Sequence, residues 1–151
     1  VYLSHIKNKE DNYMLANGAT LEYKTAKETT YTKLAGLKEI PEMGVEPEKV
    51  ENTTLEDTIK SYEMGIGDPG DIAYKFKYDN TDENSPYRVL RAYEKSGEVL
   101  SFKETLKDGT TTSFSGQISL KRTGGGVNGV IEFDLNIALS SALEIEDPKI
   151  V

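Results

Sequence analysis

The stretch from Glu39 to Gly70 constrains the fold of this 151-residue chain more than any other part of its sequence. Prolines and glycines interrupt it throughout: Pro41, Gly44, Pro47, Gly65, Gly67, Pro69 and Gly70. Proline removes a backbone donor and glycine weakens regular elements, so we expect no helix here and no strand longer than about six residues. We therefore predict a long extended loop, with one short strand at Lys49–Thr54.

A connection of this length is uncommon in a compact domain, and such connections are usually functional or disordered. The apolar and β-branched residues of the stretch argue against full disorder: Val50, Leu55, Ile59 and Met64. We interpret the stretch as an arm that needs a second surface to lie on, such as the surface of a neighbouring copy of the chain.

The sequence on both sides of the arm predicts β-strands. Alternation of apolar and polar residues is typical of a half-buried strand, and it is clearest at Asp71–Asp79. One face of that run is apolar: Ile72, Tyr74, Phe76 and Tyr78. Further strands are predicted at Ala19–Lys24, Thr29–Leu34, Glu98–Leu106, Thr110–Lys121 and Val130–Ser140, and in the tail around Leu143 and Ile145.

One helix is predicted after this clearest strand. Ser85 suits the N-cap, Pro86 suits the first helical position, and Gly97 can adopt the left-handed conformation that ends a helix. Between two later strands, Asp108-Gly109 predicts a type I′ hairpin. The predicted fold class is mainly β: an antiparallel β-sandwich or barrel with one short α-helix and a long extended loop.

Charge and composition exclude several classes of function. The net charge of −8 disfavours a nucleic-acid-binding protein, which needs clustered Lys and Arg. Because the chain has no cysteine, disulfides, thiolate metal sites and cysteine nucleophiles are excluded. No apolar run approaches the ~20 residues that cross a membrane as a helix.

No group of residues predicts catalysis. The only histidine is His5, in the N-terminal extension, and any Ser-His-Asp arrangement would depend on that one residue, so such a site is disfavoured. The glycine run Gly124–Gly126 leads into a strand, whereas a phosphate cradle leads into a helix. Glu132 and Asp134 share a strand face and have the chemistry of a glycosidase pair, but solvated strand charges are the favoured interpretation. We therefore expect no enzyme.

One short polar run has the spacing of a calcium loop. Asp79, Thr81 and Glu83 occupy alternate positions, but Asn84 stands where such a loop has glycine and Leu90 where it has glutamate. A turn with helix-capping residues is favoured, and we expect no metal and no cofactor.

Eight short motifs follow one another along the chain: Leu37–Gly44, Glu46–Glu51, Thr53–Asp57, Gly65–Gly70, Asp108-Gly109, Phe114–Gly116, Asn128-Gly129 and Ser140-Ser141. This ordered series resembles the major tail tube proteins of siphophages and covers roughly Met14 to Ile145. Val45 departs from the pattern, because a second glycine is common there. Residues 1–13 have no counterpart, so we expect them to be an N-terminal extension, with Met14 as the natural start and residues 14–151 as a single tail-tube-like β domain.

The resemblance implies a subunit that forms hexameric rings stacked into the hollow tube of a long non-contractile tail. In that family the arm reaches neighbouring subunits or rings, and DNA passes through the lumen during ejection. The implied partners are further copies of the chain, the tape measure and tail terminator proteins, and DNA as a transient passenger, with no membrane. The implied location is the virion tail, after assembly in the host bacterial cytoplasm.

The resemblance also directs attention to two sets of residues. Contacts between subunits are expected from seven arm residues: Glu46, Pro47, Lys49, Thr53, Thr54, Leu55 and Asp57. An acidic or polar strand face is expected to line the lumen, because a carboxylate repels a nearby phosphate by about 1 kcal/mol in water. Two candidates remain open for that face: Glu132, Asp134 and Asn136, or the uncharged series Thr111, Ser113, Ser115, Gln117 and Ser119.

Two alternative functions remain open. One is the tube protein of a contractile tail or a type VI-like secretion system, which the presence of a sheath would distinguish. The other is a carbohydrate-binding β-sandwich, which glycan binding by the monomer would distinguish.

Overall fold

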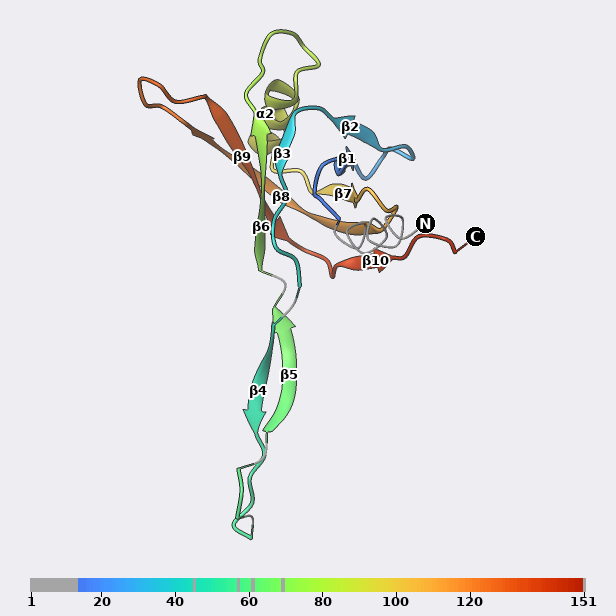
Figure 1. Ribbon diagram of the computed structural model, residues 1–151, viewed down its shortest axis with the longest axis vertical. Helices are drawn as coiled ribbons and strands as arrows, with labels where there is room; N and C mark the ends of the chain where they lie inside the picture. Colours follow the sequence, from blue (N-terminus) through green and yellow to red (C-terminus); the bar gives the residue numbers. More distant parts are fainter. Residues whose placement is uncertain (1–13, 45, 57, 61, 69, 151) are drawn as a thin grey trace, which may run out of the picture.

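The computed structural model describes residues 14–44, 46–56, 58–60, 62–68 and 70–150. Its main sheet has the strand order β2-β1-β7-β8-β9-β6-β3, and β10 also pairs with β8 (Figure 1). The sheet is antiparallel throughout and its two end strands do not meet, so the fold is an open β-sandwich rather than a closed barrel. The strands are β1 (Thr20–Lys24), β2 (Thr32–Leu34), β3 (Leu37–Glu39), β6 (Asp71–Lys77), β7 (Leu100–Thr105), β8 (Thr111–Thr123), β9 (Glu132–Leu139) and β10 (Glu144–Glu146).

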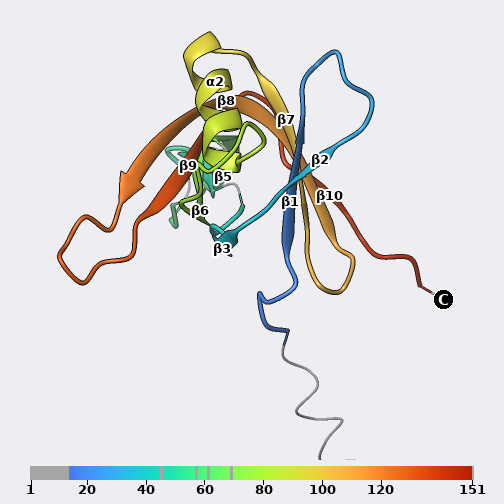
Figure 2. The same cartoon turned by 90° about the horizontal axis from the view of Figure 1, so that it is seen from above.

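The long strand β8 belongs to two half-sheets that face each other (Figure 2). Residues 111–116 of β8 pair with β7 on one side, and β10 pairs with residues 111–113 on the other. From Gly116 onward β8 pairs with β9. We call β2, β1, β7, β10 and the first part of β8 the β1 half-sheet, and the rest of β8 with β9, β6 and β3 the β9 half-sheet.

Gly116 marks the point where β8 passes from one half-sheet to the other. It is the register partner of both Leu100 on β7 and Leu139 on β9. A Cβ atom at Gly116 would lie 2.3 Å from the carbonyl oxygen of Ala138, so only glycine allows the two strands this approach. The register against β8 changes between the end of β9 and the start of β10. In this gap the Ser141 hydroxyl accepts a hydrogen bond from the Ser115 amide (2.8 Å).

The core lies between the half-sheets and is built from the inward-facing residue of each alternating pair. Tyr74, Phe102 and Phe114 stack across it, with ring centroids 5.7–6.2 Å apart. Other fully buried side chains are Leu21, Phe76, Leu90, Leu100, Phe133, Leu135 and Ile137. The apolar face predicted for the strand after the arm is thus confirmed, because Ile72, Tyr74 and Phe76 are buried and Tyr78 packs against them.

The predicted helix is confirmed as α2 (Pro86–Ser96). Gly97 ends it in the left-handed conformation, with φ of 71°. Ser85 occupies the N-cap position, but its hydroxyl accepts a hydrogen bond from the Asp82 amide and does not cap the helix. The helix packs against the core through Tyr87 and Tyr93. Their rings make edge contacts with Phe133 and Tyr23, at centroid distances of 5.2 Å and 5.9 Å. No described helix has the length and apolar character needed to cross a membrane.

The arm differs from the predicted extended loop. Instead of a loop with one strand at Lys49–Thr54, it is a separate two-stranded hairpin of β4 (Glu46–Glu51) and β5 (Tyr62–Asp68), which projects from the body (Figure 1). Pro47 lies in β4 next to an irregularity in the pairing, where the strand tolerates a residue without an amide donor. Pairing between β4 and β5 gives their backbone amides and carbonyls hydrogen-bond partners, so the glycines of β5 do not prevent a strand. β5 has seven residues, whereas we expected strands of no more than about six.

The Asp108-Gly109 turn also differs from its prediction. Leu106 and Thr110 pair through a 2.9 Å hydrogen bond, so three residues form the loop. A type I′ turn needs positive φ at two positions, but only Gly109 (99°) has it, and no described non-glycine residue does.

One ionisable pair joins the half-sheets inside the core. The Tyr74 hydroxyl on β6 donates a hydrogen bond of 2.6 Å to Oε2 of Glu104 on β7, and both residues are buried. Burial raises the pKa of the Glu104 carboxyl, which the Tyr74 hydrogen bond partly opposes. Burial and the neighbouring Glu104 also raise the pKa of Tyr74. A carboxyl that keeps its proton more firmly when folded destabilises the protein as pH rises.

We expect Gly116→Ala to destabilise the fold by about 1–3 kcal/mol, because its methyl group would collide with the backbone of β9. Chemical denaturation measures this loss. Gly126→Ala is the matched control, because a Cβ there meets no atom within 4 Å, and it should change stability by less than about 0.5 kcal/mol. Equal effects of the two substitutions would contradict the role of Gly116.

The buried pair predicts a particular pH dependence. Below the ordinary carboxyl pKa of 4.5, Glu104 is protonated in both the folded and the unfolded chain, so it adds no pH dependence to the free energy of unfolding. Above it, the unfolded chain ionises first, so the free energy of unfolding falls until the pH exceeds the raised folded pKa. Denaturation across pH 4–8 should show Glu104→Gln gaining stability over the wild type as pH rises. A difference that stays constant across this range would contradict the prediction.

Removing the hydroxyl tests the same pair from its other side. Tyr74→Phe leaves a buried carboxyl without its donor and should cost about 1–3 kcal/mol at neutral pH. Tyr23→Phe is the control, since Tyr23 is buried in the same core and no hydrogen bond of its hydroxyl occurs among the described residues.

Candidate assembly surfaces

The arm residues expected to contact neighbours lie on one projecting hairpin. Glu46 and Pro47 are in β4, paired with Asp68 and Gly67 of β5. Lys49 follows on the same strand, and its side chain is exposed. The turn region holds three further exposed predicted residues, Thr53, Thr54 and Leu55, while Asp57 lies outside the described residues. The structure therefore gathers the described ones on a single element, and their contact role stays a prediction.

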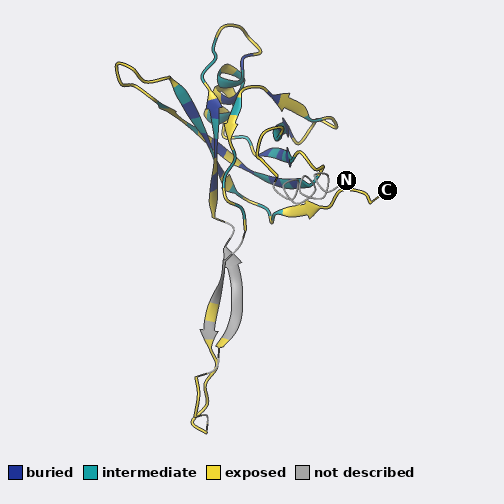
Figure 3. Cartoon of the chain, viewed as in Figure 1, coloured by how far each residue is buried: buried dark blue, intermediate teal, exposed yellow. Residues whose placement is uncertain are grey.

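Large apolar side chains stand out from the hairpin. Leu55 and Ile59 are 108% and 81% exposed, and Tyr62 at the start of β5 is 54% exposed. Figure 3 shows that the free end of the hairpin is exposed on all its described residues. Clustered exposed apolar residues mark interaction sites, and these three side chains form such a cluster on one element.

The outer face of the β9 half-sheet carries the first candidate lumen set. Glu132, Asp134 and Asn136 all point to this face, because they alternate with the buried Phe133, Leu135 and Ile137. The register places them opposite β6 and β8 residues in rows: Lys77-Glu132-Thr123, Lys75-Asp134-Lys121 and Ala73-Asn136-Ser119. The predicted common face is confirmed, but it holds lysines as well as carboxylates.

Two ion pairs cross this face between strands. The Lys75 ammonium lies 3.4 Å from Oδ1 of Asp134, and the Lys38 ammonium lies 3.2 Å from Oε2 of Glu132. That Glu132 oxygen is shielded from solvent, and its contact with Lys38 is ionic, without hydrogen-bond alignment. Sequence reasoning missed these lysines as partners. The alternation at Asp71–Asp79 placed Lys75 opposite the core, but only the strand register shows that it faces Asp134.

The second candidate face is divided by the bend of β8. Thr111, Ser113 and Ser115 lie on the outer side of the β1 half-sheet, whereas Gln117 and Ser119 are exposed on the β9 half-sheet. Ser115 is already engaged with Ser101, at 3.3 Å between hydroxyl oxygens. The uncharged series is therefore not one continuous face, as the sequence suggested, because the strand turns at Gly116.

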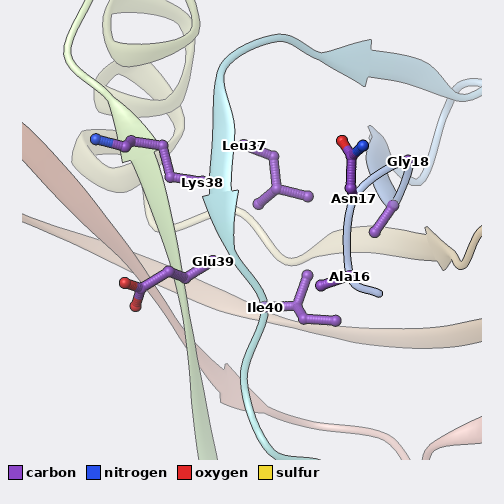
Figure 4. Close-up of a pocket in the computed structure, with 8 residues that line it drawn as sticks. Ala16, Asn17, Gly18, Leu37, Lys38, Glu39 and Ile40 are labelled. Atoms are coloured by element: carbon purple, nitrogen blue, oxygen red, sulfur yellow. The ribbon is translucent and has the colours of Figure 1, made fainter. Parts of the chain in front are cut away.

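A groove of about 370 Å³ lies between β3 and the segment before β1. Leu37 and Ile40 point toward Ala16, Asn17 and Gly18, while Lys38 and Glu39 point to the other side of β3 (Figure 4). An irregularity in the β3–β6 pairing lets these two consecutive residues share the outer face. Within the described chain β3 pairs only with β6, so its second edge borders the groove.

The polar run before the helix forms a turn. The Asp79 carboxylate accepts hydrogen bonds from the Thr81 amide (3.2 Å) and hydroxyl (2.8 Å), and these bonds lower the pKa of Asp79. Among the described residues, no group of three or more His, Asp or Glu side chains is arranged to hold a metal ion.

Comparison with known proteins gives a family match. A family model described as "Phage tail tube, TTP, lambda-like" matches residues 12–123, which is most of the chain. No curated protein matches the chain.

Solved structures share the fold. The tail of an empty GTA particle, with C6 symmetry, is 22% identical, with a TM-score of 0.65 over 87% of this chain and 99% of that one. The anti-feeding prophage baseplate contains a chain 12% identical, with a TM-score of 0.67 over 91% and 98%. The SPP1 tail tube is 11% identical, with a TM-score of 0.61 over 90% and 80%. At such identities the likeness establishes the fold alone.

The exposure of the arm predicts how its substitutions affect the subunit. Leu55→Ser combined with Ile59→Ser should change the free energy of unfolding by less than about 0.5 kcal/mol, because neither side chain packs on the core. Leu135→Ser is the contrasting variant and should cost several kcal/mol, since Leu135 is fully buried. Thermal denaturation of dilute protein measures both, and a large loss from the arm variant would place those residues in the core.

Proposed function

The chain belongs to the lambda-like phage tail tube family, and from that premise we propose that it is a structural subunit whose copies form stacked hexameric rings around a DNA-conducting lumen. The family is a structural one, found in the tail tubes of phage particles. The observation that carries the proposal is the projecting β4–β5 hairpin, which forms a sheet separate from the body and exposes the apolar side chains of Leu55, Ile59 and Tyr62.

Ring formation is supported by the open edges of the β9 half-sheet. Among the strands that the structure describes, β3 pairs on one side only, and β8 beyond Gly116 pairs only with β9. Exposed edges invite unwanted pairing, and closing a ring with identical neighbours covers them. The Leu120 amide on the β8 edge is held by the Glu94 carboxylate at 3.0 Å, which restricts where a neighbour can approach. The C6 symmetry of the GTA tail supports six copies per ring.

The lumen is assigned in this proposal to the outer face of the β9 half-sheet. The hairpin is inserted between β3 and β6, two strands of that half-sheet, and extends in the direction of β6 (Figure 1). A hairpin that reaches a neighbour therefore brings the β9 half-sheets of adjacent copies together. Glu132, Asp134 and Asn136 then face the lumen, and the β1 half-sheet faces outward.

The subunit is proposed to act without catalysis or a cofactor. Its partners are further copies of itself, the tape measure and tail terminator proteins, and passing DNA, and assembly takes place in the bacterial cytoplasm. Negative-stain microscopy of the concentrated protein tests the proposal. Tubes of stacked rings are expected, and a protein that stays monomeric at every concentration would contradict it.

Deleting the hairpin tests its role directly. Replacing Glu46–Asp68 by a short Asn-Gly turn should leave the fold intact, because the two ends are register partners and none of the buried residues described in the body lies between them. The variant should keep its far-ultraviolet circular dichroism, after allowance for the lost strands, and should form no tubes. Full-length protein under the same conditions is the control, and tubes of normal diameter from the variant would refute the role of the arm.

A further inference from the structure

The outer face of the β9 half-sheet is charged but balanced. Four basic and four acidic residues share it: Lys38, Lys75, Lys77 and Lys121, with Glu39, Asp71, Glu132 and Asp134. The chain as a whole has a net charge of −8, so the acidic excess lies elsewhere. Much of it lies in residues 40–70, which contain eight acidic and two basic residues.

The signs on this face are interleaved between strands. Asp134 has Lys75 on one side and Lys121 on the other, both in direct register. Glu132 faces Lys77 and is contacted by Lys38. Wherever two charged residues of this face are register partners, their signs are opposite, and such cross-strand pairs attract because their Cβ atoms are close.

The paired groups are partly withdrawn from solvent. The exposed fractions of the side chains are 28% for Lys75 and 26% for Asp134, and 43% for Lys38 and 20% for Glu132. Salt screens partly buried pairs less than fully exposed ones. The two ion pairs are therefore expected to hold at ordinary ionic strengths.

We propose that this face is an electrically neutral wall for double-stranded DNA. In it Glu132 and Asp134 form ion pairs with lysines that would otherwise bind phosphate. A lysine that meets a phosphate releases a counterion and adds to affinity, and a net acidic wall would repel the duplex over roughly 8–10 Å. Pairing removes both effects. The inference rests on the proposed function, because it requires the face to line the lumen, and it makes the acidic or polar lumen expected from the sequence more specific.

Removing the two carboxylates tests the wall. Glu132→Gln with Asp134→Asn keeps side-chain shape and frees two lysines per subunit. Tubes of this variant should retain short double-stranded DNA on pelleting at 50 mM salt and lose it by 200 mM, because each subunit that neutralises two phosphates multiplies the fall in affinity by roughly twelve. Wild-type tubes should retain none at either salt concentration. Retention by wild-type tubes, or none by the variant, would overturn the inference.

The matched control reverses the sign of the change. Lys38→Gln with Lys75→Gln alters the same two ion pairs but leaves carboxylates in excess, so its tubes should retain no DNA. Cryo-microscopy of the DNA-retaining variant locates the duplex, which should lie in the lumen. Density only on the outside of the tube would overturn the assignment of this face.

The unassembled subunit separates this inference from the proposed function. Fluorescence anisotropy with a short duplex should show weaker binding by the Glu132→Gln, Asp134→Asn subunit than by its tubes, with a shallower dependence on salt, and none by the wild-type subunit. DNA binding gained by the variant subunit of a protein that never forms tubes would sink the proposed function while leaving the charge balance intact. Tubes that form normally but gain no DNA binding would do the opposite.

Discussion

The close approach of β8 and β9 at Gly116 is the constraint on which the rest of the structure depends. With the missing Cβ only 2.3 Å from a backbone oxygen, no other residue lets β8 leave one half-sheet and enter the other here. Once the strand turns, the inner faces of the two half-sheets meet and form one aromatic core. The outer faces are left free to differ. One carries interleaved charges and continues into the hairpin, and the other carries serines and threonines together with Glu22, Lys24 and Lys103.

Period-two alternation separates stability from function in this molecule. On β9 the residues Phe133, Leu135 and Ile137 stabilise the fold, while the intervening Glu132, Asp134 and Asn136 are available to a lumen. Glu104 is the exception, since it occupies an inward position and lies in the core against Tyr74. Its carboxyl is costly to ionise there, and its short hydrogen bond with Tyr74 links β6 to β7 across the sandwich. The function proposed for the outer faces places no demand on this pair.

The sequence predicted the elements whose signals are local. The alternation at Asp71–Asp79 and the Ser85, Pro86 and Gly97 signals located β6 and α2, because each depends only on neighbouring residues. It missed β3 and β5, since a three-residue strand has no period to read and the glycines of β5 outweighed its pairing with β4. The prediction of a type I′ turn after β7 was wrong, because Asp-Gly fits both two- and three-residue loops and the loop here has three residues. The sequence does not show which residues are register partners, so the lysines that pair with Glu132 and Asp134 could not be predicted. It also gave no sign of the bend at Gly116, so one face of β8 was predicted to be continuous.

The central claim is that one half-sheet forms the inner wall of a tube while its inserted hairpin reaches the next subunit. A cryo-microscopy reconstruction of tubes assembled from this chain, at a resolution that shows side chains, tests it most directly. The account predicts that Lys75, Asp134 and Asn136 line the inner surface and that the β4–β5 hairpin lies against a neighbouring copy. An inner surface built from Lys103, Ser113 and Ser115 of the β1 half-sheet, or a hairpin packed on its own subunit, would contradict it.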